Sequence, residues 1–454
     1  MKNLKDKIYS KLGIKSDRTK NITKHVMFSS LFKGGSILAS FLLVPLTIGY
    51  LDTENYGVWL TLSSFIAWFS FFDIGLGNGL RNKFAVAKAN GDTKLAKAYV
   101  SSAYYTIGAV SLGLIVVFFI INSFIDWTQI FNASAGLQNE LSILMPIVFG
   151  FFCLQLVVKL ITTIYTADQQ HSTQGKIHFL TSVSSLVVIW VLTKTSESSL
   201  LLFGAIFSIL PVVILLGFNF IGFNKRYVNY KPSFRLWKKE YLKDIFGLGL
   251  KFFVIQISGV IIFSTDSIII SRMLSPKEVV PYQIAFKYFS ITTMILSIMV
   301  TPYWSSFTDA YAKKDLVWIK KSISNLMKYS FFFVLLCLGL LLVSDWSYRF
   351  WLGDLVNIPL TLSVLMTIYI IQTIIITPFT IFINGTGKVF IQTWQSLFSA
   401  LINIPLSIFF INNSSLGSAG VILATIISLL PSLILAPIQT WKLLKGNTNY
   451  LINK

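Results

Sequence analysis

The fold is decided by the stretch from Leu51 to Asp92, LDTENYGVWLTLSSFIAWFSFFDIGLGNGLRNKFAVAKANGD, because the chain contains it twice. A second copy runs from Leu274 to Asp315 in one constant register, with no gap. The copies match at Leu51 and Leu274, Trp59 and Tyr282, Phe84 and Phe307, Ala87 and Ala310, Ala89 and Ala312, and Asp92 and Asp315. A period of about half the chain indicates a two-fold duplication rather than a solenoid of short units.

The composition around this repeat is that of a polytopic membrane protein. Of 454 residues, 54% are apolar and only 12% are charged, and the mean hydropathy is +0.70. Soluble domains carry about 25% charged residues. Cys153 and Cys337 lie in apolar runs without a neighbouring His or Cys. We therefore expect buried thiols, and neither a metal site nor a disulfide framework.

Twelve apolar runs are long enough to cross a bilayer, which takes about 20 helical residues. They are 27–50, 57–80, 100–122, 142–165, 176–193, 199–223, 245–270, 282–305, 327–344, 358–383, 390–411 and 418–440. The sequence thus predicts an all-α polytopic membrane protein with about 12 transmembrane helices, in two six-helix bundles related by internal duplication.

The predicted organisation has five parts. They are a cytoplasmic amphipathic segment (1–26), an N-terminal bundle (27–223), a cytoplasmic linker (224–244), a C-terminal bundle (245–441) and a cytoplasmic tail (442–454). Leu4, Ile8 and Leu12 recur every four residues among lysines, which is typical of an interfacial helix. Because six spans is an even number, both bundles begin on the same side and form parallel repeats.

The net charge of +20 is distributed by topology. Lys and Arg concentrate in the N-terminus and in every even-numbered connection, whereas the opposite side holds only Lys194, Arg272, Lys277 and Arg349. The positive-inside rule then places both termini in the cytoplasm. This distribution excludes a nucleic-acid partner and leaves contact with anionic membrane lipids as a secondary role.

Charged residues inside the predicted spans are the candidate functional residues, because each is costly there. They are Lys33, Asp73, Lys159, Lys251, Asp266 and Lys287. Lys33 and Asp73 share one depth near the cytoplasmic side, and Asp266 and Lys287 share another near the outer side. The corresponding positions of the other copy are neutral, so we expect two ion pairs, Lys33–Asp73 and Asp266–Lys287.

Two interpretations of these charges stay open. The pairs are either structural bridges or part of a polar, cationic cavity for an anionic substrate. Lys159 and Lys251 each lie about six residues from a cytoplasmic end, so they can also snorkel to the interface.

A hinge is a second candidate feature. Gly75, Gly77 and Gly79 form a Gly-rich segment whose counterpart contains Pro302. The segment serves either close helix packing or a flexible joint for alternating access.

Catalytic and cofactor-binding motifs are not found. NGTGKV, residues 384–389, lacks the Ser or Thr of a phosphate-binding loop and predicts a turn. His25, His171 and His178 lie near cytoplasmic span ends without a carboxylate or thiol at catalytic spacing, so we expect solvated interface histidines. The sequence therefore predicts a transporter with no catalytic residue, metal or cofactor.

The repeated LDTENYGVW-like turn and K-A-N-G-D-like helix make about residues 27–441 resemble the polysaccharide (Wzx-type) flippases of the multidrug/oligosaccharidyl-lipid/polysaccharide (MOP) exporter superfamily. The resemblance implies a V-shaped pair of bundles around a central cavity in the bacterial inner (cytoplasmic) membrane. It implies alternating-access movement of an undecaprenyl-pyrophosphate-linked oligosaccharide, an O-antigen or capsule repeat unit. A polysaccharide polymerase and a chain-length regulator are implied as partners. By analogy, Lys33, Lys159, Lys251 and Lys287 would hold the pyrophosphate, and Asp73 and Asp266 would couple to protons.

Competing functions remain. An ion-coupled drug exporter of the same superfamily would require acidic residues in its cavity, but lysines outnumber acids in these spans. A membrane glycan polymerase would carry a long outer loop, and the longest here is Asn122–Leu141. A channel or structural protein would not need the duplicated, hinge-like segments.

Overall fold

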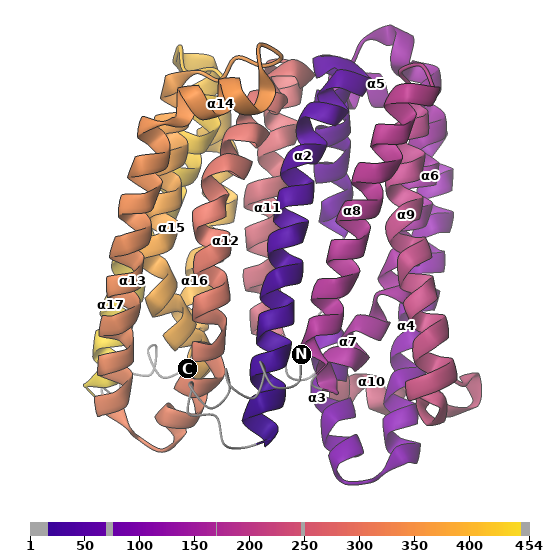
Figure 1. Cartoon of the computed structure of the whole chain (residues 1–454), viewed down its shortest axis with the longest axis vertical. Coiled ribbons are helices and arrows are strands. Elements are labelled where there is room, and N and C mark those ends of the chain that lie inside the picture. Colours follow the sequence, from indigo (N-terminus) through magenta and orange to yellow (C-terminus); the bar gives the residue numbers. More distant parts are fainter. Residues whose placement is uncertain (1–16, 70–75, 169, 247–249, 446–454) are drawn as a thin grey trace, which may run out of the picture. The chain divides into compact units, whose positions relative to one another are not determined.

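The computed structural model describes residues 17–69, 76–168, 170–246 and 250–445. This part of the chain is helical and contains no β-strand (Figure 1). The all-α prediction is thereby confirmed. The chain divides into two compact units, of which the first comprises Met1–Tyr50, Asp73–Ile125 and Ile143–Leu248, and the second Leu51–Phe72, Asp126–Ser142 and Gly249–Lys454.

The first unit contains the first part of α2 (Asp17–Trp68), up to Tyr50, and ten further helical elements or parts of them. They are α3 (Leu76–Ala89), α4 (Thr93–Asn122), most of α6 (Gln138–Val158), α7 (Leu160–Ala167), α8 (His171–Thr195), α9 (Leu200–Ile221), η3 (Gly222–Arg226), η4 (Val228–Tyr230), η5 (Phe234–Leu236) and α10 (Lys239–Phe246).

The second unit contains the end of α2 and the C-terminal helices. They are α5 (Trp127–Phe131), η2 (Ala135–Leu137), α11 (Leu250–Met273), α12 (Pro276–Ala312), α13 (Leu316–Leu342), α14 (Ser344–Leu352), α15 (Leu360–Thr386), α16 (Phe390–Asn413) and α17 (Ala419–Leu444).

Ten helices among the described residues are long and apolar enough to cross a membrane. Two features explain the difference from twelve predicted spans. The first is that α2 runs through the first predicted span and into the second, across a kink at Asp52 with φ 66° and ψ 173°. The second is α11, several side chains of which lie outside the described residues, so the ten spans counted among the described residues do not test it. Two bundles of about 12 helices in total agree with this arrangement.

The kink in α2 is a capped turn. The Asp52 carboxylate accepts hydrogen bonds from the backbone N–H and the side-chain amide of Asn55, both at 2.9 Å. These bonds satisfy donors that a new helix start leaves without partners. In the second copy the corresponding residue, Ser275, separates α11 from α12.

The backbone repeats the duplication at a second turn. Gly91 has φ 76° and precedes Asp92, whose side chain accepts from Leu95 N at 2.9 Å. Its counterpart Lys314 has φ 58° and precedes Asp315, whose side chain accepts from Trp318 N at 3.0 Å. Each turn ends one helix with a left-handed residue and begins the next with an N-cap.

The linker of the first unit, residues 224–244, is held against α4 by hydrogen bonds. The Ser233 N–H donates to Ser101 Oγ at 3.0 Å, and the Trp237 indole donates to Thr106 Oγ1 at 3.0 Å. Buried residues of α3, α4, α7 and α9 form the core beneath it, together with Tyr227, which follows η3 and is fully buried. The linker therefore forms a packed layer on this unit.

Within the second unit, the two copies of the duplicated stretch touch each other. Glu54 and Lys277 form an ion pair at 3.2 Å, although they are counterparts in the repeat. A Cβ at Gly57 would lie 1.9 Å from the Pro276 carbonyl oxygen, so the start of α12 lies against the Gly57 backbone. Only glycine allows an approach this close.

Candidate functional site

Three basic side chains of the first unit come together. Lys33 on α2 and Lys159 at the junction of α6 and α7 both interact electrostatically with His178 on α8. All three side chains are exposed. The ring of Phe32 packs on Phe179 with centroids 5.6 Å apart, which holds α2 against α8 at this point. Two of the predicted lysines therefore lie near the same histidine, and we call Lys33, Lys159 and His178 the cationic cluster.

Lys159 is positioned by a helix break. α6 ends at Val158, and the Val158 carbonyl accepts instead from the Asn219 amide of α9 at 2.7 Å. The Asn219 side-chain oxygen accepts from the Tyr104 hydroxyl at 2.8 Å. A buried backbone carbonyl needs such a partner when the helix no longer supplies one. The polar pair of Asn219 and Tyr104 thus stabilises the break that presents Lys159.

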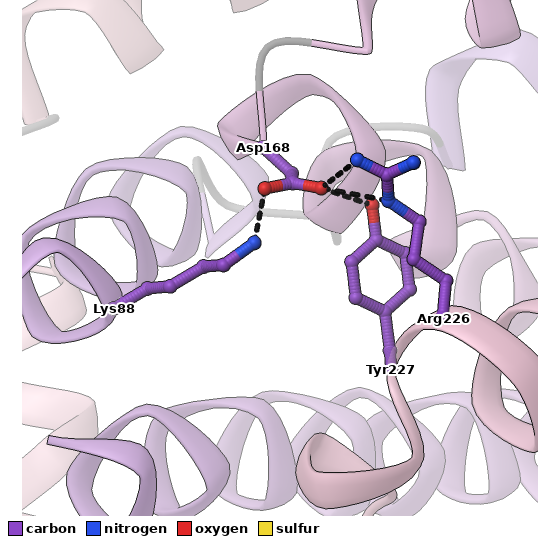
Figure 2. A network of polar contacts seen from close by, with 4 residues as sticks. All are labelled: Lys88, Asp168, Arg226 and Tyr227. Atoms are coloured by element: carbon purple, nitrogen blue, oxygen red, sulfur yellow. Dashed lines mark hydrogen bonds and ion pairs between the residues drawn. The ribbon is translucent and has the colours of Figure 1, made fainter. Parts of the chain in front are cut away.

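A polar network lies at the other end of α7 (Figure 2). Asp168 follows the helix and forms an ion pair with Lys88 of α3. Its other oxygen accepts from Arg226 Nη2 at 2.8 Å, Arg226 Nε at 2.9 Å and the Tyr227 hydroxyl at 3.0 Å. One carboxylate therefore joins α3, α7 and η3, with two cations around it.

The electrostatics of this network favour a charged Asp168. Burial by itself raises the pKa of the Asp168 carboxyl, but the hydrogen bonds from Lys88, Arg226 and Tyr227 outweigh burial and hold the pKa below its usual value. Burial, and then the neighbouring Asp168 charge, raise the pKa of the Tyr227 phenol, which stays a neutral donor. The network keeps one negative and two positive charges at neutral pH.

The structure corrects the second predicted ion pair. Asp266 is 1% exposed in α11, and its Oδ2 accepts from the Tyr282 hydroxyl of α12 at 2.6 Å. Both Asp266 and Lys287 are described, and no ion pair joins them. Tyr282 lies nearer the start of α12 and takes the position facing Asp266, whereas Lys287 is half-buried further along that helix.

The structure does not test the other candidate site residues. Asp73 and Gly75 lie outside the described residues, as do the side chains of Lys251 and Pro302, which occupy positions in α11 and α12. Gly77 and Gly79 lie in the first turns of α3. The Lys33–Asp73 pair and the hinge are therefore untested.

The sequence alone does not predict several of these contacts. His178 was expected only as an interface histidine, and Asp168 was not singled out. Asn219 did carry a signal, because it is an amide within a strongly apolar span. Among the described residues, no group of three or more His, Cys, Asp or Glu could hold a metal ion.

The described helices define a multi-pass helical membrane protein. An inward-facing multidrug resistance MATE family transporter of the MOP superfamily superposes with a TM-score of 0.77 at 14% identity, over 94% of this chain and 99% of the other. An outward-facing MATE structure gives 0.66 at 16% identity, over 96% and 98%. The chain therefore has the MOP fold.

The family follows from the sequence match. The family model described as "Polysaccharide biosynthesis protein" matches residues 22–308, and the chain belongs to that family. A relative from Yersinia pseudotuberculosis, named as an O-antigen export protein, is 22% identical over 78% of this chain and 80% of its own length. One from Salmonella typhi, named as an O-antigen transporter, is 23% identical over 72% and 74%.

Proposed function

We propose that this protein is a flippase that moves an undecaprenyl-pyrophosphate-linked oligosaccharide, an O-antigen or capsule repeat unit, across the bacterial inner membrane by alternating access. The distribution of Lys and Arg supports a cytoplasmic location for both termini. The names of the Yersinia and Salmonella relatives support an O-antigen substrate. Membrane lipids, a polysaccharide polymerase and a chain-length regulator are the partners such a role requires.

The cationic cluster is the observation that carries this proposal. Lys33, Lys159 and His178 are exposed side chains of membrane-spanning helices, where an unneeded charge is costly. A pyrophosphate carries several negative charges and cannot enter hydrocarbon without replacement of its hydration. Lysine ammonium groups provide that replacement as point charges. The cluster therefore suits an anionic headgroup better than a cationic drug.

The helix break adds a second supporting feature. Discontinuous membrane helices mark the substrate sites of many transporters, because broken segments expose backbone polarity near the ligand. Here the break lies beside Lys159, and Asn219 satisfies the freed Val158 carbonyl. A lysine at such a junction is held at a fixed place and can still change its rotamer.

The test is surface-glycan assembly in cells that lack this gene. They are complemented with wild type, Lys33→Ala, Lys159→Ala, Lys251→Ala or Lys194→Ala. Lys194 is an exposed lysine at the outer end of α8 and serves as the matched control. We expect the deletion to accumulate lipid-linked oligosaccharide on the cytoplasmic side. Lys159→Ala should fail to rescue at normal protein level, whereas Lys194→Ala should rescue.

Glycan assembly that is unaffected by the deletion would overturn the flippase. The ion-coupled drug exporter of the same superfamily would then become the next hypothesis, tested by drug susceptibility of the same strains. Full rescue by both Lys33→Ala and Lys159→Ala would instead remove the cationic cluster from the substrate path and leave the flippase standing.

A further inference from the structure

The linker of the first unit presents two aromatic side chains that the protein leaves largely uncovered. Phe234 lies in η5 and is 71% exposed, and Trp237 follows η5 and is 41% exposed. The Phe234 ring packs edge-on against Tyr105 of α4, with ring centroids 5.2 Å apart, and the Trp237 indole is held by the Thr106 hydroxyl. Contacts with α4 therefore fix both rings, which we call the aromatic pair, and leave much of their surface open.

The aromatic pair lies where an exposed apolar stripe of α4 begins. This helix is one of the candidate membrane spans, and its exposed apolar side chains recur on one face, among them Tyr105, Leu112, Val116 and Phe119. Lipid covers such a face on a helix that crosses the bilayer. Aromatic residues concentrate at the boundary between the hydrocarbon and the headgroups. The aromatic pair is therefore suited to the lipid boundary at this end of α4.

Four basic side chains accompany the aromatic pair. The segment 231–239, KPSFRLWKK, has no acidic residue and contains Lys231, Arg235, Lys238 and Lys239, which we call the basic set. All four side chains are exposed, and none forms an ion pair with an acidic side chain in the described part of the chain. A negatively charged partner is therefore the component that this surface lacks.

The backbone of this segment is fixed before a partner binds. The Ser233 N–H donates to Ser101 Oγ at 3.0 Å, and the Lys238 N–H donates to Ser102 Oγ at 3.3 Å. Both serines are fully buried on α4. The two hydrogen bonds hold the segment on either side of the aromatic pair. Binding then has to order side chains only, which lowers its entropic cost.

The combination of basic and aromatic side chains decides the chemistry of the partner. An acidic peptide would match the basic set but not the apolar stripe that continues from the aromatic pair. A zwitterionic phospholipid would cover the apolar surface but brings no net negative charge. An anionic phospholipid meets both requirements, because its headgroup attracts Lys and Arg at the membrane surface and its acyl chains cover apolar side chains.

We propose that residues 231–239 form a binding site for an anionic phospholipid. The basic set holds the phosphate, and the acyl chains pass the aromatic pair and lie along the exposed stripe of α4. The site goes beyond the proposed transport function and does not rest on it, because a lipid of the bilayer would occupy it whether or not the protein moves a glycan.

The experiment is thermal unfolding of the purified full-length protein in a neutral detergent. Phosphatidylglycerol, phosphatidylcholine with the same acyl chains, and glycerol phosphate without acyl chains are titrated in separate series. A ligand that binds only the folded state raises the melting temperature. We expect phosphatidylglycerol to raise it at the lowest concentration, and glycerol phosphate to leave it unchanged. The advantage of phosphatidylglycerol over phosphatidylcholine should shrink at about 1 M NaCl, because salt screens exposed charges.

Four variants assign the effect to the linker. Arg235→Gln/Lys238→Gln should raise the half-saturating concentration of phosphatidylglycerol about thirtyfold and change that of phosphatidylcholine little. Arg235→Lys/Lys238→Arg keeps both charges and should respond like wild type. Phe234→Gln removes an exposed ring and should weaken the binding of both phospholipids alike. Lys83→Gln/Lys94→Gln is the matched control, because it removes the same charge from α3 and the first turn of α4 in the same unit.

Four outcomes would overturn the proposal. The first is an equal response of the wild type to the two phospholipids. The second is an unchanged response to phosphatidylglycerol in Arg235→Gln/Lys238→Gln. The third is an equal loss in that variant and in Lys83→Gln/Lys94→Gln, which would indicate attraction by net charge alone. The fourth is a response to glycerol phosphate as strong as that to phosphatidylglycerol, which would assign the surface to a soluble phosphate ester.

Discussion

The Asp168 carboxylate connects side chains from three segments of the first unit. It is the common acceptor for Lys88, Arg226 and Tyr227, and its side chain is only 12% exposed. We expect Asp168→Asn to lower the free energy of unfolding by about 2 kcal/mol, because hydrogen bonds to charged groups are lost and two cations stay together. Thermal or denaturant unfolding in detergent measures this. Asp345→Asn, which breaks the exposed pair with Arg349, should change stability by less than about 0.5 kcal/mol.

The same network gives a pH dependence with a definite sign. The pKa of Asp168 is lowered in the folded protein, so the network stabilises it above the unfolded carboxyl pKa of about 3.9. That stabilisation is lost as the pH falls through the folded pKa. The stability difference between wild type and Asp168→Asn should therefore be constant near neutral pH, begin to fall at about pH 4 and be lost only below the lowered pKa of the folded protein. A difference that changes between pH 6 and 8 would contradict this assignment.

A second prediction at the residue scale uses the duplicated turn. Lys314 has φ 58°, a left-handed conformation that costs a side-chain-bearing residue about 1–2 kcal/mol, whereas glycine occupies the matching position at Gly91. Lys314→Gly should therefore raise stability by about 1 kcal/mol. The reciprocal variant Gly91→Lys should lower it by a similar amount, although a Cβ at Gly91 meets nothing within 4 Å. Effects of the same sign in both variants would show that the turn backbone is not responsible.

At the scale of single elements, the break between α6 and α7 depends on α9. Asn219→Leu leaves the Val158 carbonyl and the Tyr104 hydroxyl without partners, so we expect a loss of about 2–3 kcal/mol in stability. Tyr104→Phe keeps the bond to Val158 and should cost only about 1 kcal/mol. Because the break positions Lys159, glycan export should fall in Asn219→Leu and persist in Tyr104→Phe. Equal losses of export in the two variants would contradict a positioning role for Asn219.

The elements also show what a sequence can and cannot predict. The duplication, the capped turns before Asp92 and Asp315, and the all-α fold follow from local patterns, which each stretch of chain carries by itself. Contacts between residues on different helices do not follow from local patterns. Asp168 lies 80 residues from Lys88 and 58 from Arg226, and its contacts depend on how α3, α7 and η3 pack. Equal depth suggested Lys287 for Asp266, but depth does not determine which face of a helix a side chain occupies.

At the scale of the whole molecule, the duplication contributes to the packing, because residues of the two copies contact each other. Glu54 contacts its own counterpart Lys277, and Gly57 lies against the first residue of α12. The ion pair is partly exposed and adds little to stability. The close approach at Gly57 is the stricter requirement, since its counterpart Val280 carries a fully buried side chain and Gly57 has no room for one.

Gly57→Ala tests that contact directly. The new methyl group would lie 1.9 Å from the Pro276 carbonyl oxygen, and neither backbone can yield without moving the start of α12. We expect a loss of about 1–3 kcal/mol in unfolding free energy, together with reduced glycan export. Gly49→Ala is the matched control on the same helix, because a Cβ there meets nothing within 4 Å. Alanine favours helix, so Gly49→Ala should be neutral or stabilising by up to about 1 kcal/mol. If both variants unfolded like wild type, the start of α12 would have to adapt to an added methyl group, and the contact between the two copies would not constrain the fold.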